Sequence, residues 1–319
     1  MKLQKLVILF ILLLFVFLGI EYCSRNILFS SGKKKEIDNL TEKQQDTIPT
    51  LNLLSTFTLV KSPNSEKNKE NDTENKITSF ETEQLKFSRV RTAYKEKEDT
   101  VKKILTEKGI INDSIAEFDM YLRVIKAEKI IELWAKNRKA KKYQFIKTYD
   151  FCATSGELGP KLKAGDKQIP EGFYFIDRFN PKSNYYLSLG LNYPNKVDKI
   201  LGDTLTGLGS DIFIHGSCVT VGSIPITDDK IKELYVFAVK ARSGGQRKIA
   251  VSIFPDRLTE ANFEVMKKQY AQKSKIIKFW ETLQKGYQYF EKCRELPTIV
   301  MSNKGTYKII SKCNENTKE

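Results

Sequence analysis

A series of short apolar segments, which begins near Met120, restricts the fold of this chain more than any other feature of its sequence. Apolar and polar residues alternate in most of these segments, and Lys-rich or Gly-containing turns separate them. Alternation with a period of two residues is typical of β-strands that bury one face. We therefore predict strands in MYLRVIKAEKIIELWAKN and KYQFIKTYDFCA, and in GFYFIDRF, NYYLSLGL, DIFIHG, ELYVFAV, KIAVSIFP and the closing GTYKIIS.

Other stretches have the apolar spacing of helices. Residues 93–118 have this spacing and are predicted as a helical lead-in. The segment PITDDKIKELY is predicted to start a helix, with Thr227 or Asp228 as its cap. A long amphipathic stretch from TEANFEV to YQYFEKC is predicted as helix, capped at Thr259. The expected fold class is a β-rich α+β domain with helices packed around the strands.

The composition of the chain changes along its length. Residues 24–92 are rich in Ser, Thr, Asn, Lys and Glu and show little periodicity, which is typical of a disordered linker. The predicted order is a signal peptide or signal anchor at 1–23, the linker at 24–92, the helical lead-in at 93–118, a folded domain at 119–312 and a tail at 313–319.

The amino terminus carries Lys2 and Lys5 before an uncharged apolar run, Leu6 to Ile20. As a helix this run is about 22 Å long, shorter than the roughly 30 Å hydrocarbon core of a bilayer, and its length favours a signal peptide. The residues that follow it contain no small-x-small cleavage site, which favours an uncleaved anchor. We expect an exported, periplasmic domain in the cell envelope, anchored in the inner membrane. A lipid on Cys23 is not expected, because the preceding residues match a lipobox poorly.

The formal charge of +15 is concentrated in the carboxyl-terminal part, since residues 1–100 carry +2 and residues 101–319 the remaining +13. Such an excess suits nucleic acid, an anionic membrane or a polyanionic wall. The lysines are scattered, however, and no nucleic-acid-binding motif accompanies them. We therefore interpret them as a solvated surface and predict no nucleic-acid partner.

The segment HGSCVTVGS contains His215, which is the only histidine of the chain. A strand that ends at His215 and a turn at Gly222 would bring the imidazole close to residue 223. A base beside a nucleophile, with backbone amides turned towards a developing oxyanion, is the geometry of an acyl-transfer site. One histidine, with cysteines at no recognised spacing, does not make a zinc site, and we predict neither a metal nor a cofactor.

Four blocks of the sequence resemble, in order, those of the YkuD-like L,D-transpeptidases, in particular their YafK-type murein subgroup. The blocks are TSGELGPKLKAGDKQIPEGFY, IFIHGSCVTVGS with PITDD, GGQRKIAVSIFPDRLT, and FWETLQKGYQYFEKCRELPTI. The resemblance implies an L,D-transpeptidase catalytic domain, a mixed β-sheet sandwich with helices packed around it, at residues 119–312.

The resemblance also implies roles for the residues of the second block. His215 takes the place of the general base, Gly222 that of the oxyanion turn, and Ser223 that of the nucleophile. Gly216 and Thr220 are expected to contact substrate. Outside this block, Lys161 and Arg242 are candidates for binding substrate carboxylates. The alternatives are a β-turn at SGELGPK and a solvated hairpin tip at ARSGGQRK.

The family has cysteine where this chain has Ser223, and a hydroxyl is much harder to deprotonate than a thiol. Three interpretations stay open. Ser223 is a working nucleophile; the site is a degenerate or Cys-to-Ser form that keeps the fold and the pocket; or Cys218 serves as an alternative nucleophile. Cys293 and Cys313 are a further possible disulfide pair.

The function implied by the resemblance is acyl transfer on peptidoglycan stem peptides, for cross-linking or for attachment and detachment of proteins. With water as acceptor, the same site would be an L,D-carboxypeptidase or an amidase. The rivals are a catalytically dead peptidoglycan-binding module and a scaffold in which the linker matters most. The expected partners are stem peptides and, through the amino-terminal segment, the inner membrane.

Overall fold

The structure is a computed structural model, and it describes residues 80–112 and 117–311. The predicted amino-terminal segment, most of the predicted linker, Cys313 and the tail therefore lie outside the described residues. Within the described ranges, no helix combines the length and the apolar character that crossing a bilayer requires.

Eight strands form one mixed sheet, in the order β3-β2-β1-β8-β4-β5-β6-β7. Strand β1 runs parallel to β8 and β6 runs parallel to β7, and the other neighbouring strands are antiparallel. The strands are β1 (Phe118–Ile125), β2 (Ile130–Asn137), β3 (Gln144–Asp150), β4 (Gly172–Asn180), β5 (Ser188–Leu191), β6 (Phe213–His215), β7 (Ile224–Pro225) and β8 (Ile249–Phe254).

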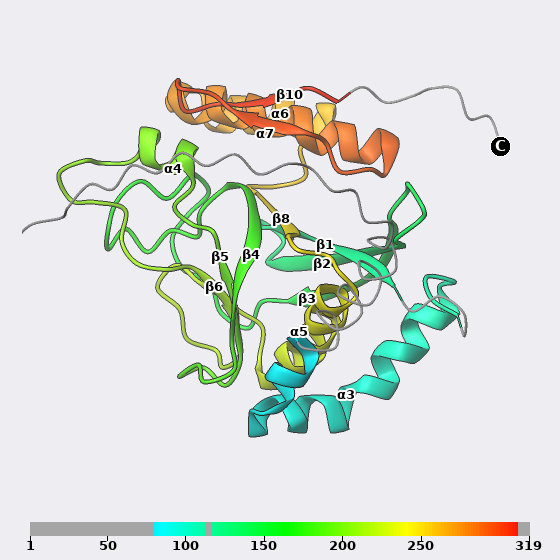
Figure 1. Cartoon of the computed structure of the whole chain (residues 1–319). Helices are drawn as coiled ribbons and strands as arrows, with labels where there is room; N and C mark the ends of the chain where they lie inside the picture. Colours follow the sequence, from blue (N-terminus) through cyan, green and yellow to red (C-terminus); the bar gives the residue numbers. More distant parts are fainter. Residues whose placement is uncertain (1–79, 113–116, 312–319) are drawn as a thin grey trace, which may run out of the picture. The chain divides into compact units, whose positions relative to one another are not determined.

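Helices cover both faces of this sheet (Figure 1). On one face, α3 (Ser88–Glu107) and α5 (Asp228–Ser243) share a buried core with Leu122 and Val124 of β1. On the other face, α6 (Glu260–Gln269) and α7 (Ser274–Cys293) pack against Ile125 and Phe254. Alternate residues of β1 thus enter different cores, which is why the strand is buried almost throughout. The α+β class is confirmed, but helices take the place that a second sheet would have in the expected sandwich.

The predicted strand ELYVFAV is wrong, because these residues lie within α5. The six residues from Leu234 to Val239 are all fully buried. A helix that is buried on every side has no polar face, so its apolar run cannot be distinguished from a buried strand by period. Its start is as predicted at Asp228, although Thr227, in the N-cap position, makes no side-chain capping bond.

The predicted helical lead-in starts earlier than residue 93. Helix α3 begins at Ser88, and residues 80–85 are also helical. These earlier residues are packed, since Phe80 contacts Phe179 edge to face and Gln84 accepts a hydrogen bond of 2.7 Å from the buried Tyr235. The predicted disordered linker is therefore wrong from Phe80 onwards.

The helix predicted near the carboxyl terminus is present, but it is divided into two helices, α6 and α7. The Thr259 hydroxyl caps α6 by accepting from the Asn262 amide at 3.3 Å. The closing strand exists as β10 (Tyr307–Ile309), but it pairs with β9 (Ile299–Met301) and not with the main sheet. A short helix, α4 (Lys196–Leu201), lies between β5 and β6.

Candidate active site

The register of β6 and β7 places Ser223 beside β6, the strand that carries His215. Ile214 is opposite Ile224 and His215 is opposite Pro225. Ser223 immediately precedes β7, and its Oγ accepts a hydrogen bond of 3.1 Å from the amide of Phe213, two residues before His215 on β6. Position 223 therefore lies beside the strand that carries the imidazole, as the spacing of the motif predicts.

The His215 side chain is buried, with 1% of its surface exposed. Its Nδ1 lies 2.6 Å from the carbonyl oxygen of Gly216. Because a carbonyl can only accept, we assign the ring proton to Nδ1, which leaves a lone pair on Nε2. Burial lowers the pKa of His215, while the bond to Gly216 opposes this shift. The lowered pKa favours the neutral imidazole, and the bond to Gly216 holds it in a tautomer suited to a general base.

Tyr185 covers the imidazole from the loop between β4 and β5. The two ring centroids are 4.6 Å apart, with an angle of 32° between the planes. The carbonyl oxygen of Tyr185 would be 2.8 Å from a Cβ at Gly216, and the Asp228 Oδ1 would be 2.5 Å from it. Gly216 is therefore a position with no room for a side chain. Its predicted contact with substrate stays a prediction.

Asp228, at the start of α5, fixes the loop that follows His215. Its Oδ1 accepts a hydrogen bond of 2.7 Å from the amide of Ser217, a residue with a positive φ of 59°. Neither Asp228 nor Tyr185 was identified as a site residue from the sequence. There Asp228 is predicted as a helix cap and Tyr185 as part of a strand, because both contacts with the site are formed by tertiary packing.

The turn before Ser223 is closed by Thr220. The Thr220 hydroxyl donates to the carbonyl oxygen of Ser223 at 2.6 Å and accepts from the amide of Gly222 at 3.1 Å. The hydroxyl expected to contact substrate is therefore used within the turn. The Gly222 amide already donates to the Thr220 hydroxyl, so it can stabilise an oxyanion only after this hydrogen bond breaks.

Gly222 also packs against a loop at residues 155–171. It has a φ of 129°, and a Cβ there would lie 2.9 Å from the carbonyl oxygen of Gln168. Glu171, at the end of this loop, is fully buried. Its carboxylate accepts hydrogen bonds from Lys126 at 2.8 Å, from the Gly159 amide at 2.7 Å and from Trp280 of α7 at 2.6 Å. The loop that supports the turn is thus anchored in the core.

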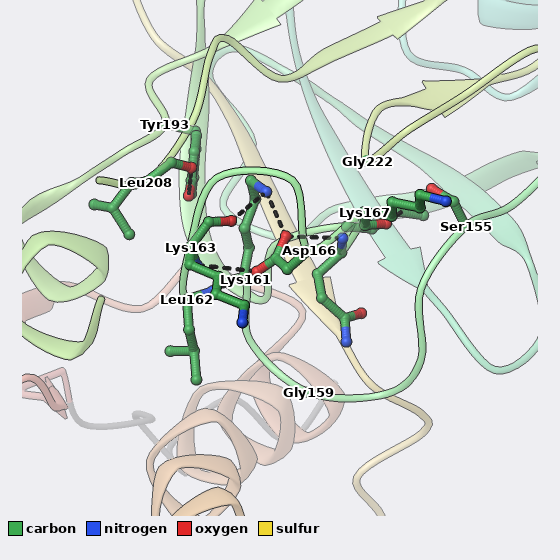
Figure 2. Close-up of polar contacts among 12 residues, drawn as sticks. Ser155, Gly159, Lys161, Leu162, Lys163, Asp166, Lys167, Tyr193, Leu208 and Gly222 are labelled. Atoms are coloured by element: carbon green, nitrogen blue, oxygen red, sulfur yellow. Dashed lines mark hydrogen bonds and ion pairs between the residues drawn. The ribbon is translucent and has the colours of Figure 1, made fainter. Parts of the chain in front are cut away.

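Lys161 does not face a cleft, contrary to the prediction. Figure 2 shows its ammonium group turned into the 155–171 loop, where it lies 2.5 Å from Asp166 and 3.0 Å from the carbonyl oxygen of Lys163. Its side chain is 5% exposed. Asp166 also accepts hydrogen bonds from three backbone amides. The Lys161 ammonium and these three bonds lower the pKa of the Asp166 carboxyl. Lys161 is therefore a structural residue of the loop.

Arg242 lies near the end of α5 that is remote from Asp228. Asp228 and Arg242 are fourteen residues apart in α5, which corresponds to about 21 Å along the helix axis. The Arg242 guanidinium donates to the carbonyl oxygen of Arg247 at 2.8 Å and lies over the ring of Phe80. The predicted contact of Arg242 with substrate stays a prediction.

Cys218 forms a disulfide with Cys152, which follows β3. The two Cα atoms are 5.3 Å apart and the residues are 66 positions apart in sequence. A disulfide sulfur carries no thiolate, so Cys218 is not a free nucleophile in this structure. No pattern in the sequence indicated the partner of Cys218. In the described part of the chain, no three His, Cys, Asp or Glu side chains are grouped to hold a metal ion.

Residues 119–250 match the YkuD family, described as the L,D-transpeptidase catalytic domain. The chain is 37% identical over 195 residues to "Putative L,D-transpeptidase YafK" of Escherichia coli strain K12, over 60% of this chain and 74% of that protein. The protein of the same name from Escherichia coli O157:H7 matches to the same extent.

Two solved structures are similar at a lower level. A point mutant of the helical cell shape determining protein Pgp2 from Campylobacter jejuni has 24% identity and a TM-score of 0.34, over 49% of this chain and 55% of that one. Bd1075 from Bdellovibrio bacteriovorus has 19% identity and a TM-score of 0.32, over 58% and 78%. The chain thus spans about half the length of the first structure. From its match to YafK, the chain belongs to the YkuD family of L,D-transpeptidase catalytic domains.

Proposed function

We propose that this domain carries out acyl transfer on peptidoglycan stem peptides, with His215 as general base and Ser223 in the attacking position. The observation that carries the proposal is the hydrogen bond from His215 Nδ1 to the Gly216 carbonyl oxygen. It fixes the free lone pair on Nε2, while the β6–β7 register keeps residue 223 at the start of the neighbouring strand. Membership in the family supports the class of reaction.

In the first half of the reaction, Ser223 Oγ attacks the carbonyl carbon at the L-centre of a stem-peptide diamino acid. The hydroxyl proton passes to His215 Nε2 as the C–O bond forms. The C–N bond to the terminal D-amino acid then breaks, and the imidazolium returns the proton to the leaving amine. The acyl group is left as an ester on Ser223.

In the second half, an amine of another peptide or protein attacks this ester. His215 takes a proton from the amine, the C–O bond breaks, and the proton restores the Ser223 hydroxyl. With water in place of the amine, the same steps give L,D-carboxypeptidase or amidase activity. The acceptor thus decides between cross-linking, attachment and release.

A serine makes this site slower than a cysteine would. In serine enzymes, a carboxylate orients the histidine and stabilises its charged form, whereas His215 has the neutral carbonyl of Gly216. The Phe213 amide, which donates to Ser223 Oγ, partly offsets this by stabilising negative charge on the oxygen. A binding module that has lost catalysis is the second candidate, because it needs the fold and not the nucleophile.

Within this proposal, the amino-terminal segment at 1–23 holds the domain in the cell envelope, in the periplasm and at the inner membrane. The linker that follows lets the domain reach the wall. Loss of the envelope fraction of the protein after deletion of residues 1–23 would support this arrangement. An unchanged distribution between fractions would contradict it.

The test of the catalytic proposal is incubation of the full chain with a carbapenem or a stem tetrapeptide, read by intact mass and peptide mapping. We expect a covalent adduct on Ser223, and no adduct in the Ser223→Ala or His215→Gln variants. Binding of isolated peptidoglycan without any adduct would favour the binding module. An adduct on Cys218 would overturn the assignment of the nucleophile.

A further inference from the structure

Tyr185, which stacks on His215, lies in a turn whose backbone is hydrogen-bonded by a residue that precedes the family match. The amide of Tyr185 donates to the hydroxyl of Ser183 at 3.0 Å, and Ser183 is buried. The next residue, Tyr186, has a φ of 70°. An aromatic residue in the left-handed region is strained, and it stays there only where the surroundings hold it.

Arg89 of α3 supplies that restraint. Its Nη1 donates to the carbonyl oxygen of Ser183 at 2.5 Å and to that of Tyr186 at 2.8 Å. The guanidinium carbon also lies 5.6 Å from the centre of the Tyr186 ring. One guanidinium therefore bonds the backbone on both sides of Tyr185. Both bonds come from Nη1, whose two N–H groups can donate to the two carbonyl oxygens at once.

Helix α3 is itself fixed to the domain. Lys97 forms an ion pair of 2.7 Å with Asp229, and Glu98 one of 2.6 Å with Lys240, both on α5. The start of α3 lies beside the turn between β4 and β5 (Figure 1). Arg89 thus extends from a helix held on α5, at a position outside the 119–250 match.

We propose that Arg89 is a positioning residue for His215, because it holds the 183–186 turn in the conformation that keeps Tyr185 stacked on the imidazole. The catalytic importance of this contact rests on the proposed function, but the positioning does not. The helix α3 then belongs to the working site, although it precedes the domain that the family match covers. Without Arg89, the 183–186 turn is free to relax, and Tyr185 no longer stays stacked on the imidazole.

The consequence is a change in the surroundings of the imidazole. The Tyr185 ring packs against the imidazole, and burial is the leading cause that lowers the pKa of His215. Tyr185 and Asp228 are ionisable side chains in contact with this segment, and none of the variants below replaces Asp228 or Ser217. A rise in the pKa of His215 therefore reports loss of the Tyr185 cover.

The chain has one histidine, so its titration can be followed without assignment. The experiment labels the full chain with histidine carrying 13C at Cε1 and follows the single imidazole signal by NMR from pH 4 to 8. We expect Arg89→Ala and Tyr185→Ala to raise the pKa of His215. Tyr185→Phe and the matched control Arg91→Ala should leave it unchanged, since the Arg91 guanidinium donates to the Leu85 and Lys86 carbonyls instead.

A second readout uses Ser223→Cys as a reporter background. We expect its thiol to react with iodoacetamide about tenfold more slowly at pH 7 when Arg89→Ala is added, because the base is displaced. Adding Arg91→Ala should not change the rate. If the thiol shows no dependence on His215 at all, the proposed function fails, while the NMR titration still decides the positioning.

An Arg89→Ala variant whose His215 titrates like that of Arg91→Ala overturns the proposal, and so does a Tyr185→Ala variant that titrates like the wild type. Should Arg89→Ala lower the melting temperature enough to unfold the chain under these conditions, Arg89→Met decides instead. The methionine keeps an unbranched apolar stem but has no N–H donor for the two carbonyl oxygens. An Arg89→Met variant with an unchanged titration then counts against the proposal.

Discussion

Cys152 and Cys218 form a disulfide that ties the segment after β3 to the loop between His215 and Ser223. The loop also carries the Ser217 amide bonded to Asp228 and the Thr220 hydroxyl bonded to Ser223. The covalent link therefore acts on the segment that sets the distance between base and nucleophile. It also suits the oxidising compartment expected from the amino-terminal sequence.

Removal of this disulfide is expected to destabilise the domain. For a closed loop of 66 residues, the chain-entropy model gives about 4 kcal/mol of stabilisation. Urea unfolding of the Cys152→Ser/Cys218→Ser double variant should show a loss of this order relative to the wild type. In Cys152→Ser alone, Cys218 should become reactive to iodoacetamide. A thiol at Cys218 that reacts equally in the folded wild type would contradict the disulfide.

The Ser223→Cys variant is expected to acylate faster than the wild type. A thiol is deprotonated far more easily than a hydroxyl by a neutral imidazole, so the gain in the rate of carbapenem acylation should reach about 10³-fold or more. Stopped-flow or timed intact-mass measurements would give the rate. Adding His215→Gln should remove most of the gain, and a gain that survives it would exclude His215 as the base.

Gly222→Ala is expected to disturb the turn before Ser223. The new Cβ would lie 2.9 Å from the Gln168 carbonyl oxygen, at a φ of 129°. We expect a loss of about 1 to 3 kcal/mol in the free energy of unfolding, together with lower acylation of the Ser223→Cys background. Gly165→Ala is the matched control, since its φ is also positive but no atom lies within 4 Å. Equal losses in both variants would show that the close contact has no effect.

Asp198 is expected to make stability depend on pH. It is buried, and its oxygens accept from Tyr174 and from the Asn195 amide, both at 2.8 Å. Burial raises the pKa of Asp198 to about 7, against about 3.9 in an unfolded chain. The folded state thus binds more protons in this window, so the contribution of Asp198 falls as pH rises from about 4 to 7, by about 4 kcal/mol at most.

Urea unfolding of the wild type and Asp198→Asn at pH 5 and pH 8 would measure this effect. The wild type should lose more stability on going to pH 8 than the variant, which has no such proton to release. His215 acts in the opposite direction, because its lowered pKa removes stability as pH falls below about 6.5. Both proteins share that contribution, so it cancels in the comparison. Parallel pH dependences would refute the shift of Asp198.

The strands were largely readable because a period of two is a local property of the sequence. Segments such as GFYFIDRF and KIAVSIFP became β4 and β8 as expected. The order of the sheet was not readable, since β1 pairs with β8 across more than a hundred residues. The helix α5 was missed for most of its length because complete burial removes the polar face that marks a helix.

The placement of residue 223 beside the strand that carries His215 was predicted from the sequence, because only residues 216–223 connect β6 to its neighbour β7. Whether a side chain is available was decided by tertiary structure alone. Lys161 and Cys218 have the right chemistry for their predicted roles, but Lys161 is paired with Asp166 and Cys218 is bonded to Cys152. Charges and thiols are paired through space, by residues whose distance in sequence carries no signal, and the same holds for the contact of Tyr185 with His215.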